Sequence, residues 1–410
     1  MTKGINYEKN LVYIHLESLN HAIYGHRQWF PCLNSIYSRS LRMNNFISTA
    51  TSSIMALSDL VHGDDDVLEH NFALEEGISV NRTSDTLFDQ LQMFGYQTQG
   101  IGYPKSWASV DSVWSRSQSF HWHDSSIEML AEAEEIVADK TQPFALYCWN
   151  LSSHLCYADA IKRSGQHSFE NWQLGYKSMD NTIGHILQLL IKHQQLENTI
   201  IVGFGDHGDD FWNHGYNGGF AHSIEPYTSL VHTPAFIFDP SRVNQDINHL
   251  VSLTDLKQTT LDLIGLPYLD TPQTPSYSAL SGQRKYCFSR NLFSQQPESS
   301  SESPLHKGYS ITSDFFHLLY SNGGYQMFAW QADTANQFDL LSLFVESEAG
   351  EKRLNVERLG KGRLGGPHPH ITRFLGENCH RVIQENYCDL RARLDERIAE
   401  KNSRVVTQSR

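Results

Sequence analysis

Two apolar runs in this chain each lead directly into side chains that bind metal ions. Residues 11–16 (Leu-Val-Tyr-Ile-His-Leu) lead into Glu17. Residues 199–204 (Thr-Ile-Ile-Val-Gly-Phe) lead, through a glycine, into Asp206 and His207. Such runs are typical of strands buried in a parallel sheet, and ligands bind at the carboxyl ends of these strands. The pattern therefore predicts a parallel α/β sheet in which the three side chains meet.

Elsewhere in the first two thirds of the chain, apolar runs alternate with amphipathic patterns. We expect helices over residues 31–40, 53–61, 83–94, 125–139, 169–193 and 253–264, and further strands over residues 96–101, 144–149 and 234–238. Strands separated by helices imply right-handed crossovers and a mostly parallel sheet. The predicted fold class is therefore α/β, with a mostly parallel central sheet flanked by helices.

The C-terminal part has a different pattern. Short alternating segments predict antiparallel strands over residues 309–311, 315–320 and 325–330, with Asn322-Gly323-Gly324 as a hairpin turn, and residues 376–401 predict a charged helix. Residues 291–307 have the low-complexity composition of a loop. We therefore expect a main domain over residues 1–290. A small C-terminal subdomain with an antiparallel sheet and a terminal helix follows over residues 308–410.

Composition excludes two classes of partner. The 410 residues carry a net charge of −14, so no basic stripe drives binding to nucleic acid. No apolar run approaches the roughly 18–20 residues of a membrane span. The first ten residues have no apolar signal region, and the six cysteines form no Cys-x-x-Cys pair. We therefore expect a cytoplasmic protein with reduced thiols.

A divalent metal and a hydroxyl group are the chemistry that the sequence favours. Asp206 and His207 stand between glycines, and carboxylate plus imidazole suits Mn²⁺, Zn²⁺ or Fe better than Ca²⁺. A polar turn is the alternative explanation. The hydroxyl-rich residues 48–53 end where a helix is expected to begin, and a helix N-terminus favours an anion. Helix capping is the alternative there.

Five segments resemble the sulfatase branch of the alkaline phosphatase superfamily, in that family's order. They are Leu16-Glu17-Ser18, the hydroxyl-rich turn leading to Val61-His62-Gly63, residues 86–98, Gly205-Asp206-His207-Gly208 with Asn213-His214-Gly215 and Thr233-Pro234, and residues 251–267. The resemblance extends over residues 10–345. It implies one divalent ion (Mn²⁺, Zn²⁺, Mg²⁺ or Ca²⁺) held by Glu17, Ser53, Asp206 and His207.

The chain departs from that family at the nucleophile. Sulfatases carry Cys-x-Pro-x-Arg or Ser-x-Pro-x-Arg, whose first residue is oxidised to formylglycine. The equivalent position, ten residues before Gly63, is Ser53, and the next four residues include neither Pro nor Arg. We therefore expect an unmodified serine, with Thr51 as the alternative nucleophile. Glu17 stands in place of paired aspartates, which resembles the phosphoglycerol and phosphoethanolamine transferases of the same superfamily.

The resemblance implies a metal-dependent hydrolase of phosphate esters (phosphodiester, phosphomonoester or phosphonate ester) that forms a covalent seryl or threonyl intermediate. The alternatives are a phospho-alcohol transferase onto a soluble glycan, a sulfuric ester hydrolase without formylglycine, and a metal-free binding module. The substrate would be a small-molecule or glycan ester, and homo-oligomer formation is left open. The further predicted residues are His154, His214 and His222 for catalysis, and Lys105, Trp149 and Asn150 for substrate binding.

Overall fold

The computed structural model describes most of the chain, in two compact units. The described residues are 9–65, 72–73, 77–78, 85–105, 110–154, 169–211, 213–214, 222–269, 276–291, 308–321, 323–346, 352–354 and 379–408. The first unit comprises Met1–Gly208 and His232–Arg284, and the second comprises Asp209–Val231 and Lys285–Arg410. Residues 209–231, which we expected in the main domain, thus cluster with the C-terminal residues. The predicted loop lies outside the described residues from residue 292 on.

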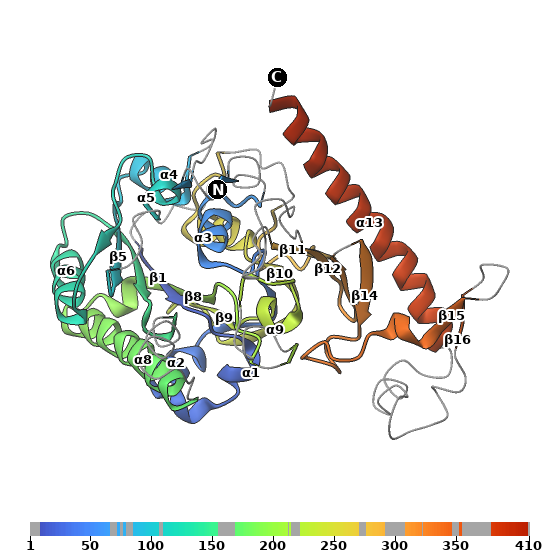
Figure 1. The fold of residues 1–410 in the computed structure, drawn as a ribbon. Helices are drawn as coiled ribbons and strands as arrows, with labels where there is room; N and C mark the ends of the chain where they lie inside the picture. The colour runs from blue at the N-terminus through green and yellow to red at the C-terminus, as the bar shows by residue number, and fades with distance from the viewer. Residues whose placement is uncertain are drawn as a thin grey trace. The chain divides into compact units, whose positions relative to one another are not determined.

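An eight-stranded sheet organises the first unit (Figure 1). Its strands, in spatial order, are β10 (Gln245–Ser252), β2 (Leu41–Ile47), β9 (Ala235–Phe238), β8 (Thr199–Gly205), β1 (Asn10–Leu16), β7 (Phe144–Asn150), β5 (Gln97–Tyr103) and β6 (His121–Trp122). β9 runs antiparallel to both of its neighbours, and the other neighbouring pairs are parallel. The predicted mostly parallel sheet is confirmed. A separate small hairpin pairs β3 (Phe72–Ala73) with β4 (Gly77–Ile78).

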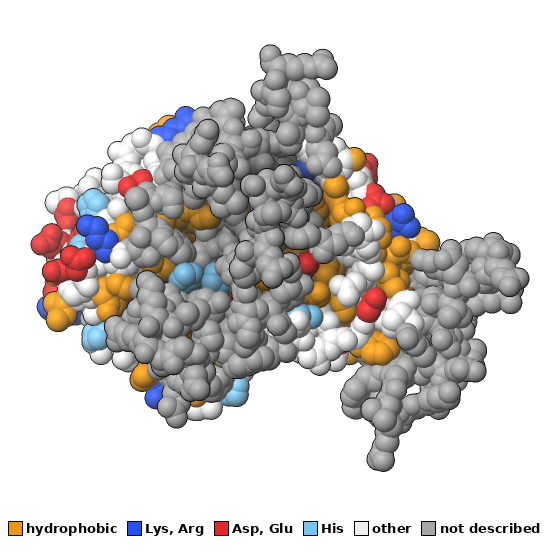
Figure 2. All heavy atoms as spheres, in the orientation of Figure 1, with side chains coloured by type: hydrophobic (Ala, Val, Ile, Leu, Met, Phe, Trp, Pro, Cys, Tyr) orange, Lys and Arg blue, Asp and Glu red, His pale blue; other side chains and the backbone are white. Residues whose placement is uncertain are grey.

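Helices cover both faces of this sheet (Figure 1). α2 (Pro31–Tyr37), α6 (Ser126–Ala138) and α8 (Phe169–Lys192) form one layer, and α3 (Ser53–His62), α4 (Leu87–Met93), α5 (Asp111–Trp114) and α10 (Asp255–Ile264) form the other. The short α1 (His21–Tyr24) and the 3-10 turns η1 (Arg27–Trp29) and η3 (Leu196–Asn198) lie in connections. Acidic and basic side chains lie side by side on the surface where α6 and α8 lie (Figure 2). One ion pair joins the two helices, with Lys192 Nζ on α8 2.5 Å from Glu134 Oε1 on α6.

Local sequence explains where these helices begin and end. The Thr86 side chain accepts from the backbone N–H of Asp89, whose carboxylate accepts from the Thr86 N–H in return, so a capping box starts α4. α3 ends at Gly63, whose φ of 66° is left-handed and suits glycine. Asp180 on α8 accepts from the backbone N–H groups of Cys32 and Leu33 at the start of α2. That contact ties two helices of one layer together.

Among the strands that were not expected from the sequence, β2 and β10 belong to the central sheet. β2 reads Leu-Arg-Met-Asn-Asn-Phe-Ile, and its consecutive asparagines interrupt the alternation of buried and exposed positions. β10 begins with exposed polar residues. Both lie towards one edge of the sheet, where β2 pairs with β10 and β9. Pairing with neighbouring strands, rather than a period-two pattern, defines them.

The second unit contains the small antiparallel sheet that the sequence predicts. β11 (Cys287–Asn291), β12 (Gly308–Thr312), β13 (His317–Ser321) and β14 (Gly324–Phe328) follow one another in space as in sequence. The other elements are α9 (Thr228–Val231), η5 (Leu340–Leu343), the pair β15 (Phe344–Glu346) and β16 (Lys352–Leu354), and the terminal helix α13 (Cys379–Gln408). α13 buries Ile383, Leu390 and Leu394 against Ile311 and Leu318 of the sheet. Within the described part of the chain, no helix has the length and apolar character of a membrane span.

Candidate metal centre

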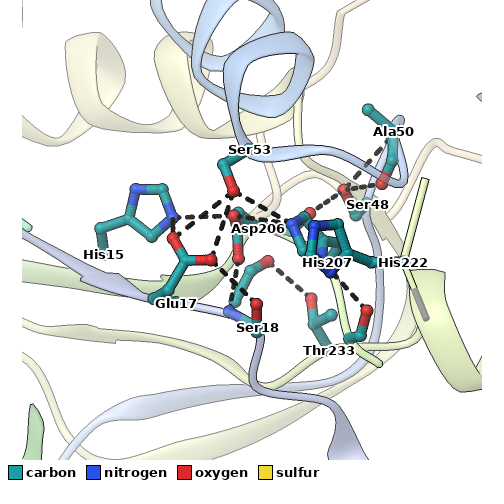
Figure 3. Close-up of polar contacts among 12 residues, drawn as sticks. His15, Glu17, Ser18, Ser48, Ala50, Ser53, Asp206, His207, His222 and Thr233 are labelled. Carbon is teal, nitrogen blue, oxygen red and sulfur yellow. Dashed lines mark hydrogen bonds and ion pairs between the residues drawn. The ribbon is translucent and has the colours of Figure 1, made fainter. Parts of the chain in front are cut away.

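Glu17 and Asp206 emerge at the same edge of the central sheet. β1 and β8 are parallel neighbours, with Leu16 opposite Gly205, and each acidic residue directly follows its strand (Figure 3). Both side chains are fully buried. The parallel register therefore brings together two carboxylates that are distant in sequence, as predicted.

Ser53 approaches these groups from the first turn of α3. Its Oγ lies 3.0 Å from His207 Nε2, and 3.3 and 3.4 Å from the two carboxylate oxygens of Glu17. His207 Nε2 lies in turn 3.4 Å from Asp206 Oδ2. The four residues predicted to hold a metal ion thus lie together (Figure 3).

A fifth residue, His15, was missed by the sequence analysis. It lies two positions before Glu17 on β1 and is 1% exposed. Its Nε2 lies 3.0 Å from Asp206 Oδ2 and 3.5 Å from Glu17 Oε2. Ligand atoms of His15, Glu17 and Asp206 all lie within 4.8 Å of one another, as in a group that can hold a metal ion. The available signal was the period of two, which places His15 and Glu17 on one face of the strand.

The chemistry of this cluster fits a divalent cation. Two buried carboxylates are unfavourable without a compensating charge. His15 Nε2 and Asp206 Oδ2 are buried, and by hydrogen-bond geometry neither has a partner in the described part of the chain. Burial raises the pKa of the Asp206 carboxyl, but the neighbouring imidazoles of His207 and His15 and the Ser53 hydroxyl outweigh burial and hold that pKa below its ordinary value. A cation between the oxygen and nitrogen donors would bind both of these atoms.

The backbone around Asp206 leaves little freedom. The Ser18 N–H donates to Asp206 Oδ1 at 3.0 Å, and the Ser48 hydroxyl donates to the Asp206 backbone carbonyl. A Cβ at Gly205 would lie 2.5 Å from the Leu19 carbonyl oxygen and 2.7 Å from Thr233 Cβ. These contacts make glycine necessary before Asp206, which accounts for the Gly-Asp-His pattern.

Two aromatic residues of β7 contact the cluster from the neighbouring strand. Trp149, predicted to bind substrate, is fully buried, and its indole N–H donates to Glu17 Oε2 at 2.7 Å. Its ring also stacks on His15, with centroids 4.2 Å apart. The Tyr147 hydroxyl lies 2.7 Å from His15 Nδ1. Burial, and then the charges of Asp206 and Glu17, raise the pKa of Tyr147 well above its ordinary value, so the phenol is neutral.

The other residues predicted near the substrate lie in varied environments. The Asn150 amide donates to Thr182 Oγ1 on α8 at 2.7 Å, so this buried side chain joins β7 to a helix. Lys105 is exposed, two residues past the end of β5. His154 is half-buried in the helical residues that follow β7, and its neighbour Ser153 donates to the Glu17 backbone carbonyl at 2.8 Å. Asn150 therefore has a structural contact, and the predicted roles of Lys105 and His154 stay predictions.

The remaining predicted residues are Thr51, in the first unit, and two histidines of the second unit. Thr51 is fully buried. His214 has both ring nitrogens occupied, with Nδ1 at 2.5 Å from Asp210 Oδ1 and Nε2 at 3.2 Å from the Asn336 carbonyl oxygen. His222 Nδ1 lies 2.9 Å from Asp209 Oδ1. Within its own unit, each histidine is thus oriented by an aspartate.

Comparison with known proteins gives a consistent result. The sequence profile of the Sulfatase family matches residues 9–266. An arylsulfatase of Clostridium perfringens is 24% identical over 191 residues, which are 44% of this chain and 36% of that protein. An ulvan-active sulfatase of Formosa agariphila is 31% identical over 119 residues, 28% of this chain and 18% of that protein. Each alignment spans well under two thirds of the relative's length.

Solved structures share the fold. A 2-O GAG sulfatase superimposes with a TM-score of 0.65 at 15% identity, over 95% of this chain and 94% of that one. A protein solved in complex with its substrate D-glucosamine-2-N,6-O-disulfate gives 0.58 at 16% identity, over 82% and 93%. The lipoteichoic acid synthase LtaP from Listeria monocytogenes gives 0.58 at 14% identity, over 82% and 90%. At such identities the likeness concerns the fold alone.

Proposed function

Because the chain belongs to the sulfatase family, we propose that it is a metal-dependent hydrolase that cleaves a phosphate or sulfate ester through a covalent ester on Ser53. The observation that carries the proposal is the position of Ser53 Oγ. This buried hydroxyl lies within 3.4 Å of both Glu17 and His207, beside Asp206. A nucleophile beside a cluster of metal-binding groups is the arrangement that such a reaction needs.

A divalent ion held by Glu17, Asp206, His207 and the Ser53 oxygen would lower the pKa of the serine hydroxyl and offset charge on the substrate. The chain's own groups add to this. Ser53 opens the ten-residue helix α3, whose backbone N–H groups and dipole favour an anionic oxygen. The hydroxyl proton of Ser53 faces the Glu17 carboxylate, which accepts it as Oγ forms its new bond.

The reaction has two displacement steps. Ser53 Oγ attacks the phosphorus or sulfur atom in line, and the bond to the leaving oxygen breaks as that oxygen takes a proton. His154, the predicted catalytic histidine of the first unit, is the group that we propose for this proton transfer. Water then attacks the same central atom and releases Ser53. For a transferase, an acceptor alcohol would replace that water.

Among the ester classes we place phosphate first. Ser53 lacks the Pro and Arg that accompany formylglycine, so it keeps a single hydroxyl, and its ester opens only when water or an alcohol attacks. The arylsulfatase relatives favour a sulfate ester as the second candidate. A neighbour solved with disulfated glucosamine favours a carbohydrate carrier. The single glutamate after β1 and the synthase-like fold favour a phospho-alcohol transferase as the third.

We place the enzyme in the cytoplasm. Within the described residues, Cys32, Cys148 and Cys388 are free thiols, as is usual in a reducing compartment. Fractionation of the source cells tests this placement, and recovery of the protein outside the cytoplasm would contradict it.

The test combines metal analysis with a substrate panel. We expect the purified protein to bind a stoichiometric divalent ion and to hydrolyse one of the nitrophenyl phosphate, phosphodiester, phosphonate or sulfate esters in water alone. Ser53→Ala should lower kcat on the order of 10⁴-fold or more while metal content largely persists. Thr51→Ala is the matched control. Normal turnover by Ser53→Ala, with loss in Thr51→Ala, would move the nucleophile to Thr51. Absence of any bound ion would overturn the proposal.

A further inference from the structure

His15 has the surroundings of a metal ligand rather than of a core histidine. A buried histidine in an apolar core normally has hydrogen bonds at both ring nitrogens. Here Nδ1 lies 2.7 Å from the Tyr147 hydroxyl, while Nε2 points towards Asp206 and Glu17 and has no hydrogen-bond partner in the described part of the chain. The side chain is fully buried, so water does not supply that partner from bulk solvent.

The ring is held in this orientation by β7. β1 and β7 are parallel, with Tyr13 opposite Tyr147 and His15 opposite Trp149. The Trp149 ring stacks on the imidazole at an interplanar angle of 9°, and Tyr147 engages the far nitrogen. When the Nδ1–H donates to the phenol oxygen, the Nε2 lone pair is directed at the two carboxylates. A hydrogen bond at the other ring nitrogen is the usual support of a metal-binding histidine.

We propose that His15 Nε2 is a further ligand of the metal centre, and that this second imidazole makes the site prefer Zn²⁺ to Ca²⁺ or Mg²⁺. The donor set then contains the nitrogens of His15 and His207 beside the oxygens of Glu17, Asp206 and Ser53. Imidazole ligands favour zinc, whereas calcium and magnesium take oxygen ligands almost entirely. The proposal rests on the metal site of the proposed function, and adds a ligand and a metal preference to it.

The experiment is a titration of the metal-free full-length protein with Zn²⁺, Ca²⁺ and Mg²⁺. For His15→Asn we expect Zn²⁺ affinity to fall by more than the roughly 10–100-fold that follows loss of a residue supporting a ligand. Affinity for Ca²⁺ should change much less, so that the preference for Zn²⁺ narrows. Tyr147→Phe should lose part of the Zn²⁺ affinity. His185→Asn, an exposed histidine on α8, should bind all three ions as the unmodified protein does.

X-ray absorption at the zinc edge supplies a readout that a purely structural role would not move. We expect scattering from two imidazole rings in the unmodified protein and from one in His15→Asn. A single imidazole in the unmodified protein overturns the proposal even if His15→Asn fails to fold. Equal Zn²⁺ affinity in His15→Asn overturns it as well, and leaves the proposed hydrolase intact. No metal binding by the unmodified protein would overturn both.

Discussion

Where β1 and β8 end, the interior of the first unit holds two carboxylates and two imidazoles with almost no exposure to solvent. Between α13 and the antiparallel sheet of the second unit, the interior is aliphatic and aromatic. Apolar burial of the second kind stabilises a fold directly. Buried charges contribute little net stability and often lower it. The comparison indicates that the buried polar residues of the first unit serve chemistry and that the apolar core under α13 serves stability. Substitutions in the first group should therefore change activity, and substitutions in the second should change stability.

Of four substitutions that test this comparison, Glu17→Gln should lower activity most, with no loss of stability. The change keeps the shape of the side chain but removes its charge from the metal centre, so we expect kcat/KM to fall roughly 10³-fold. The metal-free protein should be as stable as before or more so, because Glu17 and Asp206 are like charges in one buried cluster. Kinetics and thermal unfolding measure the two effects, with exposed Glu197→Gln as control. A large loss of stability at normal activity would show that Glu17 serves stability rather than chemistry.

Leu390→Ala should instead lower stability and leave activity unchanged. Leu390 is 1% exposed on α13, and truncation of such a leucine costs about 2–5 kcal/mol of unfolding free energy. Turnover per folded molecule should stay unchanged. Calorimetry and kinetics on the same preparation test this, with exposed Glu396→Ala on the same helix as control. If folded Leu390→Ala loses catalysis while its stability is normal, the core of the second unit contributes to catalysis as well as to stability.

The stability of the folded protein should decrease in acid because the second unit buries His317. Burial lowers the pKa of His317 to about 4, and its Nε2–H donates to the Pro226 carbonyl oxygen. Below about pH 6.5 the unfolded chain binds a proton that the folded chain refuses, so stability falls as the pH drops towards 4. His317→Gln should flatten this dependence in denaturant titrations at neutral and acidic pH. An equal pH slope in the variant would show that other groups control it.

Trp149→Phe should give the smallest effect of the four. Phenylalanine keeps much of the aromatic contact with His15 but cannot donate to Glu17 Oε2. Loss of a hydrogen bond to a metal ligand typically lowers metal affinity or turnover about 10–100-fold. Metal titration measures the change in affinity, and kinetics measure the change in turnover. Trp330→Phe loses a comparable N–H bond in the second unit and should change neither.

The sequence was informative where chemistry and periodicity coincide. Glu17, Asp206 and His207 follow long apolar strands, and the family pattern then placed Ser53, so these four could be predicted to meet. β2 and β10 were missed because their pairing, not their polar-rich sequences, makes them strands. Such tertiary override is general in sheets.

His15 and Trp149 show a second kind of limit. Each stands within an apolar strand and has the sequence appearance of a core residue, or of a substrate contact in the case of Trp149. Their contacts with Glu17 depend on the register of β1 against β7, which sets His15 opposite Trp149. Register is a property of two strands, and no single segment of sequence specifies it.

That register has a consequence for anyone who would transplant this centre into a designed scaffold. A slip of β7 by one residue along β1 would turn both aromatic supports to the opposite face at once, while the glutamate and the histidine stayed where they are. A designer would therefore have to transfer β1 and β7 together, keep their register fixed, and only then design the loops.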